Sequence, residues 1–385
     1  MEKATRLVRA GDDPVGVRTV NVPLHRASTV LLDSYADLVR ANAGSHPGIT
    51  YGTDGLPAQR SFEAALCELE GGAMTRAFQS GQAAIINALL AFTGAGDHVL
   101  IADNAYGPGQ AFGHDVLARF GVTVETVPAD VGADVVDHLR PNTRLILLES
   151  PGSNTLELQD VPAVVSIARP RGIITMLDST WATPLRLQPF ALGVDASIQS
   201  VTKYIAGHSD VLLGALTVAE PLADRLDEFC RITEAYAAPE DCALALRGLR
   251  TLSVRLAQHE RSALELASWL SDQPAVGEVL HPALPTHPQH QIWRRDFTGA
   301  SGLFSFTFSS EPAEDRLAAF VDGLEHFGIG YSWGGFRSLI TASPVARRFP
   351  SRHAGRTVVR LSIGLEHPAD LRADLAGAFG RLERR

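Results

Sequence analysis

Short, strongly apolar runs alternate with segments of helical periodicity from about residue 61 onward. Several runs are hydrophobic at nearly every position, such as LILL at 145–148 and IITML at 173–177, which is typical of parallel strands buried on both faces. The pattern therefore predicts an α/β fold with a mostly parallel sheet that helices cover on both faces. The predicted strands lie near residues 98–102, 122–127, 144–149, 173–177, 196–201 and 212–218.

The first part of the chain has a different pattern. Residues 1–50 lack clear helical periodicity and predict an extended arm, with one apolar patch at 29–32. The first regular helix is expected to begin at Ser61, whose side chain can cap it, and to end at Gly71.

The rhythm changes again past residue 240. A long helical stretch is followed by alternating strand and helix patterns, which indicate a smaller α+β domain. These are strands near 303–308 and 358–363 and helices near 312–326 and 368–383. We therefore expect an arm (1–55), a large domain (56–250) and a smaller C-terminal domain (251–385).

Composition and charge exclude several classes of protein. With 45% hydrophobic and 20% charged residues, the 385-residue chain has the composition of an ordinary globular protein. The net charge of −9 argues against binding to nucleic acid or to an anionic membrane. No apolar run is long enough to span a bilayer, and no secretory signal is expected at the start. The three cysteines have neither disulfide nor metal spacing, so we expect a cytoplasmic protein without a metal site.

Lysine is nearly absent, since Lys3 and Lys203 are the two lysines among 34 basic residues. Arginine stays protonated at neutral pH, whereas a lysine amine with a lowered pKa can form a Schiff base. Lys203 follows a strand-like run and lies between two hydroxyl residues, Thr202 and Tyr204. A surface lysine retained by chance is the simpler alternative, but this setting favours covalent chemistry at Lys203.

Other candidate residues follow the predicted strands, where ligands of open parallel sheets bind. Ser80, Gly81 and Gln82 precede a predicted helix, so backbone N–H groups there can bind a phosphate, and Gly81 permits close approach. Ser200 and Thr202 can add hydroxyl donors. A small residue and a glycine before a helix most often form a simple turn, so the phosphate site depends on its neighbours.

Three further side chains have two readings each. Asp178 ends an apolar strand and either caps a helix or meets a cationic ring nitrogen, and Tyr106 either stacks on that ring or fills a loop pocket. Arg360 lies within an apolar strand and needs an anion, either an internal carboxylate or a substrate α-carboxylate. Together with a Schiff-base lysine and a phosphate site, these residues predict pyridoxal 5'-phosphate as the cofactor.

Over nearly its whole length, the chain resembles the cysteine and methionine metabolism family of pyridoxal phosphate enzymes, which have fold type I. Within that family it looks most like the bacterial cystathionine β-lyases. The stretches that carry the resemblance are Tyr51-Gly52, CELEGG (67–72), GDHVL (96–100), ESPGS (149–153), TKY (202–204) with GHSD (207–210), RGLRTL (247–252), HPALP (281–285), YSWGG (331–335), and Arg360 with IGLE (363–366).

The resemblance implies a role for each matching residue at the cofactor. Lys203 would hold the cofactor covalently, Asp178 would pair with its ring nitrogen, and Tyr106 would stack on its ring. The phosphate would be held by Gly81, Gln82, Ser200 and Thr202.

The resemblance also implies how substrate and subunits are arranged. Arg360, with Ser332 and Trp333, would orient the substrate carboxylate. Tyr51 would reach the active site of a neighbouring subunit, within a homotetramer built as a dimer of dimers. Tyr331 and Trp333, on either side of Ser332, look like a β-lyase, since γ-lyases and γ-synthases usually carry an acidic residue and a leucine there.

The chain departs from the family at several positions. Thr53 stands where an arginine usually contacts the phosphate, and the sequence offers Arg60 or Arg76 as a replacement. Ser153 stands where many relatives have an asparagine that meets the ring hydroxyl, with Asn154 one position further on. Gln82 replaces a methionine or alanine, which is tolerable because only its N–H is needed.

The predicted reaction is β-elimination from a small sulfur-containing amino acid, with L-cystathionine giving homocysteine, pyruvate and ammonia. Lys203 would act as the general base, and Lys203 or Tyr106 would protonate the departing sulfur. The alternatives are a β-lyase for other cysteine S-conjugates, a γ-lyase or γ-synthase, an amino-acid racemase, and a regulatory protein that binds the cofactor without catalysis.

Overall fold

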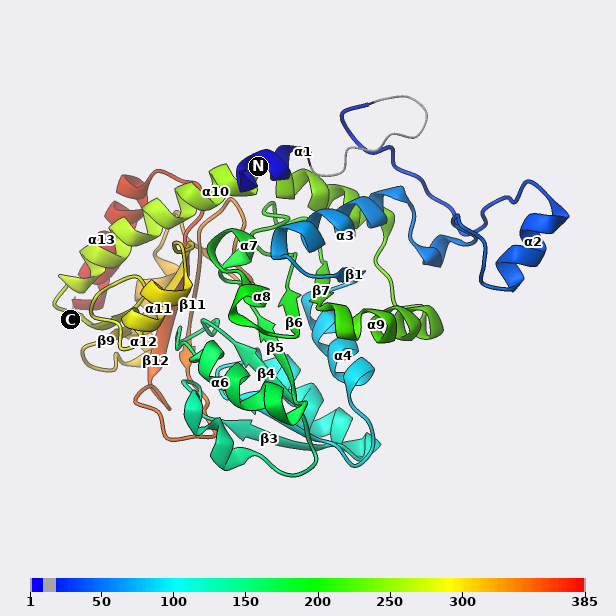
Figure 1. Ribbon diagram of the computed structural model, residues 1–385. Coiled ribbons are helices and arrows are strands. Elements are labelled where there is room, and N and C mark those ends of the chain that lie inside the picture. The colour runs from blue at the N-terminus through cyan, green and yellow to red at the C-terminus, as the bar shows by residue number, and fades with distance from the viewer. Residues whose placement is uncertain (1, 10–18, 384–385) are drawn as a thin grey trace.

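The computed structural model describes residues 2–9 and 19–383, which form two sheets covered by helices (Figure 1). The larger sheet has seven strands in the order β1-β7-β6-β5-β4-β2-β3. Strands β3, β2, β4, β5 and β6 run parallel, and β7 is antiparallel to both of its neighbours. This confirms the predicted mostly parallel sheet. The strands are β1 (Met74–Phe78), β2 (His98–Ala102), β3 (Thr123–Val127), β4 (Thr143–Glu149), β5 (Ile174–Asp178), β6 (Ala196–Gln199) and β7 (Gly214–Val218).

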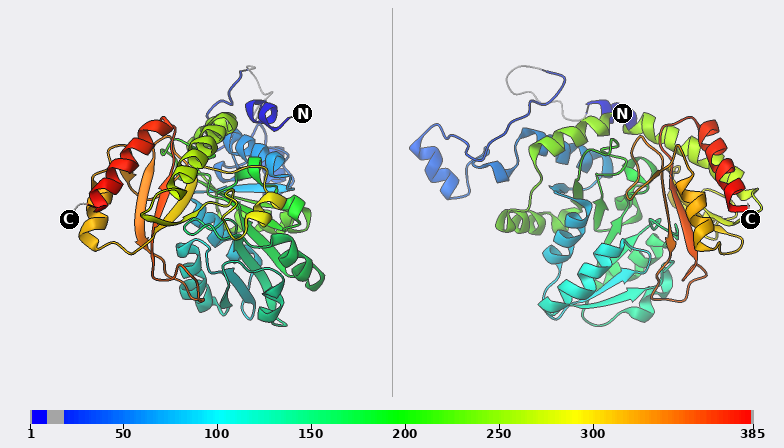
Figure 2. Two further views of the ribbon diagram at one scale, coloured as in Figure 1. Left: turned by 90° about the vertical axis from the view of Figure 1, so that its left-hand side faces the viewer. Right: turned by 180° about the vertical axis from the view of Figure 1, so that it is seen from behind.

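Apolar cores on both faces explain the continuous hydrophobic runs in these strands. Alternate side chains of β4 point to opposite faces, so Leu145 and Leu147 pack in one core while Ile146 and Leu148 pack in the other. One face is covered by α3 (Pro57–Glu70), α6 (Val161–Ala168) and the first half of α10 (Pro239–Ser271), and the other by α4 (Gly81–Phe92) and α9 (Glu220–Thr233). The layers are visible in Figure 2.

The smaller sheet has five strands in the order β10-β11-β12-β9-β8. Its core contains the clustered rings of Phe306, Phe308, Phe320 and Phe379, which join β9 to the outer helices. The predicted strands near 303–308 and 358–363 are confirmed. The elements are β8 (Val276–Leu280), β9 (Leu303–Phe308), β10 (Gly328–Ile329), β11 (Leu339–Pro344), β12 (Thr357–Ser362), α11 (His290–Asp296), α12 (Glu314–Asp322) and α13 (Pro368–Glu383).

Helix α10 belongs to both cores. Leu246, Leu249 and Leu256 pack beneath the larger sheet, whereas Leu266 and Leu270 pack in the core of the smaller one. In Figure 1 the helix runs across the top of the molecule, from one sheet to the other. The predicted boundary at residue 250 therefore falls inside a continuous helix of 33 residues.

The N-terminal region differs from the prediction of a purely extended arm. It contains α1 (Lys3–Arg9) and α2 (Tyr35–Asn42), and the Ser34 side chain caps α2 by accepting a hydrogen bond from the Asp37 N–H. Seven and eight residues are too few for the helical period to stand out. Helix α3 begins at Pro57, not at Ser61, because proline suits the first helical position.

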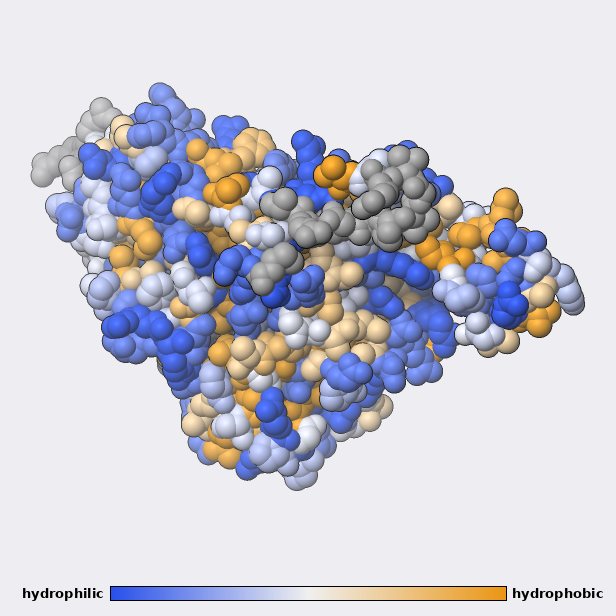
Figure 3. Space-filling view, turned by 45° about the horizontal axis from the view of Figure 1, so that its top comes forward, coloured by the Kyte–Doolittle hydropathy of each residue, from blue (hydrophilic) through white to orange (hydrophobic). Residues whose placement is uncertain are grey.

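The segment with α2 projects from the body and exposes apolar side chains (Figures 1 and 3). The largest of these are Val20, Leu31 and Tyr35, each more than four-fifths exposed. Among the described residues, no helix combines the length and apolarity needed to cross a membrane.

Shorter helical segments connect the main elements. The α-helical ones are α5 (Gly107–Ala111), α7 (Thr183–Arg186) and α8 (Pro189–Leu192). The 3₁₀ or π turns are η1 (Gly52–Asp54), η2 (Phe112–Val116), η3 (Leu117–Phe120), η4 (Ala133–His138) and η5 (Arg169–Arg171).

Candidate active site

A cavity of about 600 Å³ lies at the carboxyl ends of β4, β5 and β6, facing the smaller sheet. This edge of a parallel sheet is where the sequence placed the ligand site. Eleven predicted site residues line the cavity, namely Gly81, Gln82, Tyr106, Asp178, Ser200, Thr202, Lys203, Tyr331, Ser332, Trp333 and Arg360. Tyr51 and Thr53 do not line it; both lie at the base of the projecting segment, where the Tyr51 side chain is half exposed.

Lys203 lies in the turn after β6, largely enclosed by the cavity wall. Its Nζ donates a hydrogen bond to Ser332 Oγ at 2.6 Å and lies 5.4 Å from the centre of the Trp333 ring. Burial and the Arg360 charge together lower the pKa of the amine to about 8, against the opposing charges of Asp178 and Glu149. An amine with this lowered pKa is neutral more often near neutral pH than an ordinary lysine, and the neutral form is the one that acts as nucleophile and base.

The backbone of Ser332 is strained where it meets Lys203. Its φ is +79°, in the left-handed region that residues with a side chain rarely adopt. Gly334, two residues on, has a φ of +81°, and a Cβ there would lie 2.7 Å from the Tyr204 nitrogen. The segment therefore packs directly against the backbone of the lysine turn, and the strain is held where the site needs an exact fit.

Asp178 is buried at the end of β5. Its Oδ1 accepts hydrogen bonds from the Thr180 N–H at 3.0 Å and from the Thr180 hydroxyl at 2.5 Å. Burial raises the pKa of the carboxyl, while the Thr180 hydrogen bonds and the Lys203 charge oppose that rise. The alternative role as a helix cap is wrong, because α7 begins only at Thr183 and its N-cap is Ala182.

The N-terminus of α4 forms the opposite wall of the cavity. Ser80 caps this helix by accepting from the Ala83 N–H, and Gly81 is its first residue. A Cβ on Gly81 would lie 2.5 Å from Ser200 Oγ, so only glycine allows the two segments to approach this closely. The positive end of the helix and the Ser200 hydroxyl together suit a phosphate.

The remaining predicted phosphate ligands have partners within the chain. The Thr202 hydroxyl donates to the Leu213 carbonyl at 3.1 Å and accepts from the Leu213 N–H at 2.9 Å. The Gln82 side chain donates to the Pro108 carbonyl at 3.0 Å, which leaves its backbone N–H as the group that faces the cavity end of α4. Both side chains therefore also brace the loops around the site.

Arg360 extends from β12 into the cavity, and its partners are not carboxylates. Its Nη1 donates to the Ser153 carbonyl at 3.3 Å and to Asn154 Oδ1 at 3.1 Å. Within the described chain it makes no ion pair, although the charge of Glu149 is near enough to act on its pKa. Asn154, which stands one position after the usual asparagine, thus contacts the arginine, and an anion is still needed to neutralise the guanidinium.

The two arginines that the sequence offers as replacements at Thr53 lie in different places. Arg76 forms ion pairs with Glu63 and Asp227, and Arg60 donates to the Asp54 carbonyl. Neither residue lines the cavity. Arg60 therefore lies in the same region as Thr53, whereas Arg76, in β1, is held by carboxylates.

Sequence reasoning missed the role of Glu149, which it used only as part of the ESPGS stretch. Glu149 ends β4, pairs in register with Asp178 and lines the cavity. Burial and the neighbouring Asp178 raise the pKa of its carboxyl to about 8. A charged residue directly after the LILL run was the signal that could have identified it.

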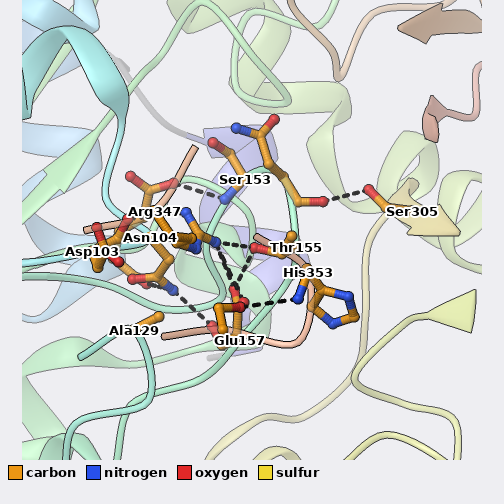
Figure 4. Close-up of polar contacts among 12 residues, drawn as sticks. Asp103, Asn104, Ala129, Ser153, Thr155, Glu157, Ser305, Arg347 and His353 are labelled. Carbon is orange, nitrogen blue, oxygen red and sulfur yellow. Dashed lines mark hydrogen bonds and ion pairs between the residues drawn. The ribbon is translucent and has the colours of Figure 1, made fainter. Parts of the chain in front are cut away.

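The smaller sheet is fastened to the site by Arg347, in the loop after β11 (Figure 4). Its guanidinium donates to the Asp103 carbonyl at 3.0 Å and to the Thr155 hydroxyl, and it pairs with Glu157 at 3.2 Å. The Asp103 carboxylate in turn accepts the N–H groups of Arg348 and Phe349. These contacts hold the loop against the edge of the cavity.

Comparison with known proteins identifies the class of this fold and site. The family model for Cys/Met metabolism PLP-dependent enzymes matches residues 4–380. The chain belongs to this family, whose members depend on pyridoxal phosphate.

Individual relatives cover nearly the whole chain. Cystathionine β-lyase MetC of Escherichia coli K12 is 41% identical over 98% of both chains, and an L-alanine/L-glutamate racemase of Wolbachia pipientis is 38% identical over 99% of this chain and 98% of its own. A solved structure of cystathionine γ-synthase from Xanthomonas oryzae, in complex with aminoacrylate and cysteine, superposes with a TM-score of 0.91 at 31% identity, over 100% of this chain and 99% of that one.

The residues in the cavity fit the cofactor of the family. The close approach of Gly81 to Ser200, beside a helix N-terminus, suits its phosphate, and the Lys203 amine suits its aldehyde. Asp178, a buried carboxylate at the neighbouring strand end, suits a ring nitrogen. The cavity thus offers suitable groups for the phosphate, the aldehyde and the ring nitrogen of the cofactor.

Proposed function

We propose that this protein is a carbon–sulfur β-lyase of the cystathionine β-lyase type, which converts L-cystathionine and water to homocysteine, pyruvate and ammonia. The observation that carries the proposal is the Lys203 amine, held by Ser332 beside Trp333 and in one cavity with Arg360. The sequence Tyr331-Ser332-Trp333 and the full-length similarity to several cystathionine β-lyases favour β-elimination over the other reactions of the family.

The proposed reaction begins with substrate binding at Arg360. The guanidinium pairs with the α-carboxylate and, together with Ser332, fixes the α-carbon near the Lys203 amine. Pyridoxal phosphate, when bound, supplies an electron sink for the bond broken at that carbon. The Asp178 carboxylate would hold the protonated ring nitrogen, and Tyr106 would hold the cofactor ring.

Lys203 carries the proton transfers in this proposal. Its amine, with a pKa lowered to about 8, accepts the α-proton from the substrate. Lys203 then gives this proton to the departing sulfur; alternatively, the Tyr106 hydroxyl gives its own proton and is afterwards reprotonated. Ser332, which accepts a hydrogen bond from Lys203 Nζ, holds the amine in place for both transfers.

A long thioether fits the space around Arg360. A second cavity of about 520 Å³ adjoins the first, and the two share Gly107, Asn154, Thr341, Ser343 and Arg360. A substrate anchored at Arg360 therefore has room for a side chain well beyond that of cysteine. Other cysteine S-conjugates remain substrates to be compared with cystathionine in the same assay.

The racemase reaction is the second candidate, because a racemase is among the similar proteins. It needs the same proton removal at the α-carbon without loss of a side chain. Incubation with L-alanine and chiral separation of the product tests it. A γ-lyase or γ-synthase would give 2-oxobutyrate, not pyruvate, from cystathionine, and a regulator that only binds the cofactor would turn over none of these compounds.

We also propose a homotetramer, in which the arm (1–55) reaches a neighbouring subunit in the cytoplasm. The exposed apolar side chains of the projecting segment and the half-exposed ring of Tyr51 support this arrangement. Tyr51 and Thr53 would then approach the cofactor of the neighbour, since they do not line the cavity of their own chain.

A substrate panel tests the proposed function. Purified holoenzyme is incubated with L-cystathionine and with S-alkyl cysteines, and pyruvate, 2-oxobutyrate and free thiol are measured. The expected result is equimolar pyruvate and homocysteine from cystathionine. Production of 2-oxobutyrate, or no keto acid from any thioether, would refute the β-lyase proposal.

A further inference from the structure

The Glu149 carboxylate joins two loops that carry different groups of the active site. Its Oε2 accepts the Tyr106 backbone N–H at 2.6 Å, and its Oε1 accepts the Ser153 N–H at 3.0 Å. The side chain is only 6% exposed. Each oxygen thus has its own donor, so one rigid group fixes the relative position of two backbone segments.

Each of these segments carries a group of the active site. Tyr106 presents its ring to the cavity from the start of α5. On the other side, the Ser153 carbonyl and the Asn154 side chain are the two acceptors for Arg360 Nη1. Glu149 therefore lies one hydrogen bond from the Tyr106 backbone and two from the Arg360 guanidinium.

The burial of the Glu149 carboxyl disfavours its charged form, and no cation of the described residues pairs with it directly. A buried carboxylate is ordinarily neutralised by a directly paired cation, but within the described chain Glu149 forms no ion pair. Asp178 lies beside it in register on β5, so two carboxylates share one strand edge. The positive charges that face them are Lys203 and Arg360, both of them site residues.

We propose that Glu149 is a positioning residue, which fixes the Tyr106 ring and the Arg360 guanidinium relative to each other through its two backbone hydrogen bonds. The inference rests on the roles proposed above for Tyr106 and Arg360. A change in the Glu149 carboxylate should therefore displace two groups at once, namely the Tyr106 ring at the cofactor and the Arg360 guanidinium at the substrate carboxylate.

The test uses the holoenzyme of Glu149→Gln, whose amide offers one acceptor where the carboxylate offers two. A matched control is Asp374→Asn, because Asp374 also accepts two backbone N–H groups, from Glu325 and His326, but lies in α13 away from the cavity. Glycine is the binding probe, since it has an α-carboxylate and no leaving group. Its Kd is measured by absorbance titration, and the circular dichroism of the bound cofactor reports the ring environment.

For Glu149→Gln, the glycine Kd is expected to rise about tenfold or more, with a changed cofactor dichroism, because misplacement of about 1 Å is costly at such sites. Asp374→Asn is expected to melt earlier while leaving both signals as in the wild type. Glu149→Asp, which keeps the carboxyl group but shortens its reach, should behave like Glu149→Gln and provides the test if the glutamine variant does not fold.

A glycine Kd within twofold of the wild type and an unchanged dichroism in a folded Glu149 variant would overturn the inference. A change in only one of the two, the glycine Kd or the dichroism, would also overturn it, because Glu149 would then not position both groups. Glycine binding does not require elimination, so the two proposals can fail separately. If the wild type makes no pyruvate while Glu149→Gln still changes both the glycine Kd and the dichroism, the β-lyase proposal is refuted and the positioning role of Glu149 stands.

Discussion

The role of Arg360 can be tested by separating its charge from its shape. The guanidinium donates hydrogen bonds from Nη1 to the Ser153 carbonyl and Asn154 Oδ1, and it makes no ion pair within the described chain. Its remaining N–H groups are the ones available to a substrate carboxylate. Arg360→Lys keeps the charge but loses the fork, whereas Arg360→Gln loses both.

The size of the effect follows from the hydrogen bonds that are lost. A hydrogen bond to a charged group contributes about 1.5–3 kcal/mol, and about 1.4 kcal/mol corresponds to a factor of ten in affinity. Arg360→Gln should therefore raise the Kd for glycine about tenfold to 150-fold. Arg360→Lys should fall between Arg360→Gln and the wild type, because a point charge replaces the two-donor contact but retains the attraction.

Glycine and glycinamide distinguish carboxylate binding from a general loss of structure. The wild type should bind glycine more tightly than glycinamide, and Arg360→Gln should bind the two about equally. The pyruvate assay with cystathionine should show the same loss, mainly as an increase in KM. If Arg360→Gln keeps the wild-type preference for glycine, Arg360 does not bind the carboxylate and the reasoning is wrong.

Three further outcomes are expected. Lys203→Ala should abolish pyruvate production, and borohydride reduction of the wild type should add the mass of the cofactor to the peptide that contains Lys203; wild-type turnover by the variant would contradict its role. Gly81→Ala should weaken cofactor binding at least tenfold, measured as cofactor lost on dialysis, because the new Cβ would lie 2.5 Å from Ser200 Oγ; unchanged retention would show that the two segments can separate. Binding of pyridoxal phosphate to the apoenzyme, followed by stopped-flow absorbance, should accelerate with rising pH and level off above about pH 9, since only the neutral amine reacts and the Lys203 pKa is lowered to about 8. In Arg360→Gln this plateau should move to higher pH, because the Arg360 charge helps to lower that pKa.

The sequence predicted the larger sheet well because local signals sufficed there. Runs such as LILL at 145–148 are buried on both faces whatever lies next to them, and their ends fix the edge where Asp178 and Lys203 meet. The sequence did not predict the short helices α1 and α2, since seven or eight residues give too few turns for periodicity. It also placed the start of α3 at Ser61, because the signal of a capping side chain outweighed the proline at residue 57.

The site was predictable as far as single residues carry chemistry by type. Lysine, a strand-end aspartate and a strand arginine stand out in one sequence, whereas Glu149 gains its importance from the Tyr106 and Ser153 N–H groups that only folding brings to it. The partners of Arg360 are a carbonyl and an amide, and no spacing rule connects residue 360 with residues 153 and 154.

The continuity of α10 limits how the protein can move. A straight helix of 33 residues is about 50 Å long, and bending it would break hydrogen bonds in the middle of two packed cores. Opening the two sheets by a hinge would therefore have to bend this helix, whereas surface loops such as the one that Arg347 holds lie outside it. Adaptation to a new thioether is accordingly expected to alter that loop while the shared shaft stays as it is.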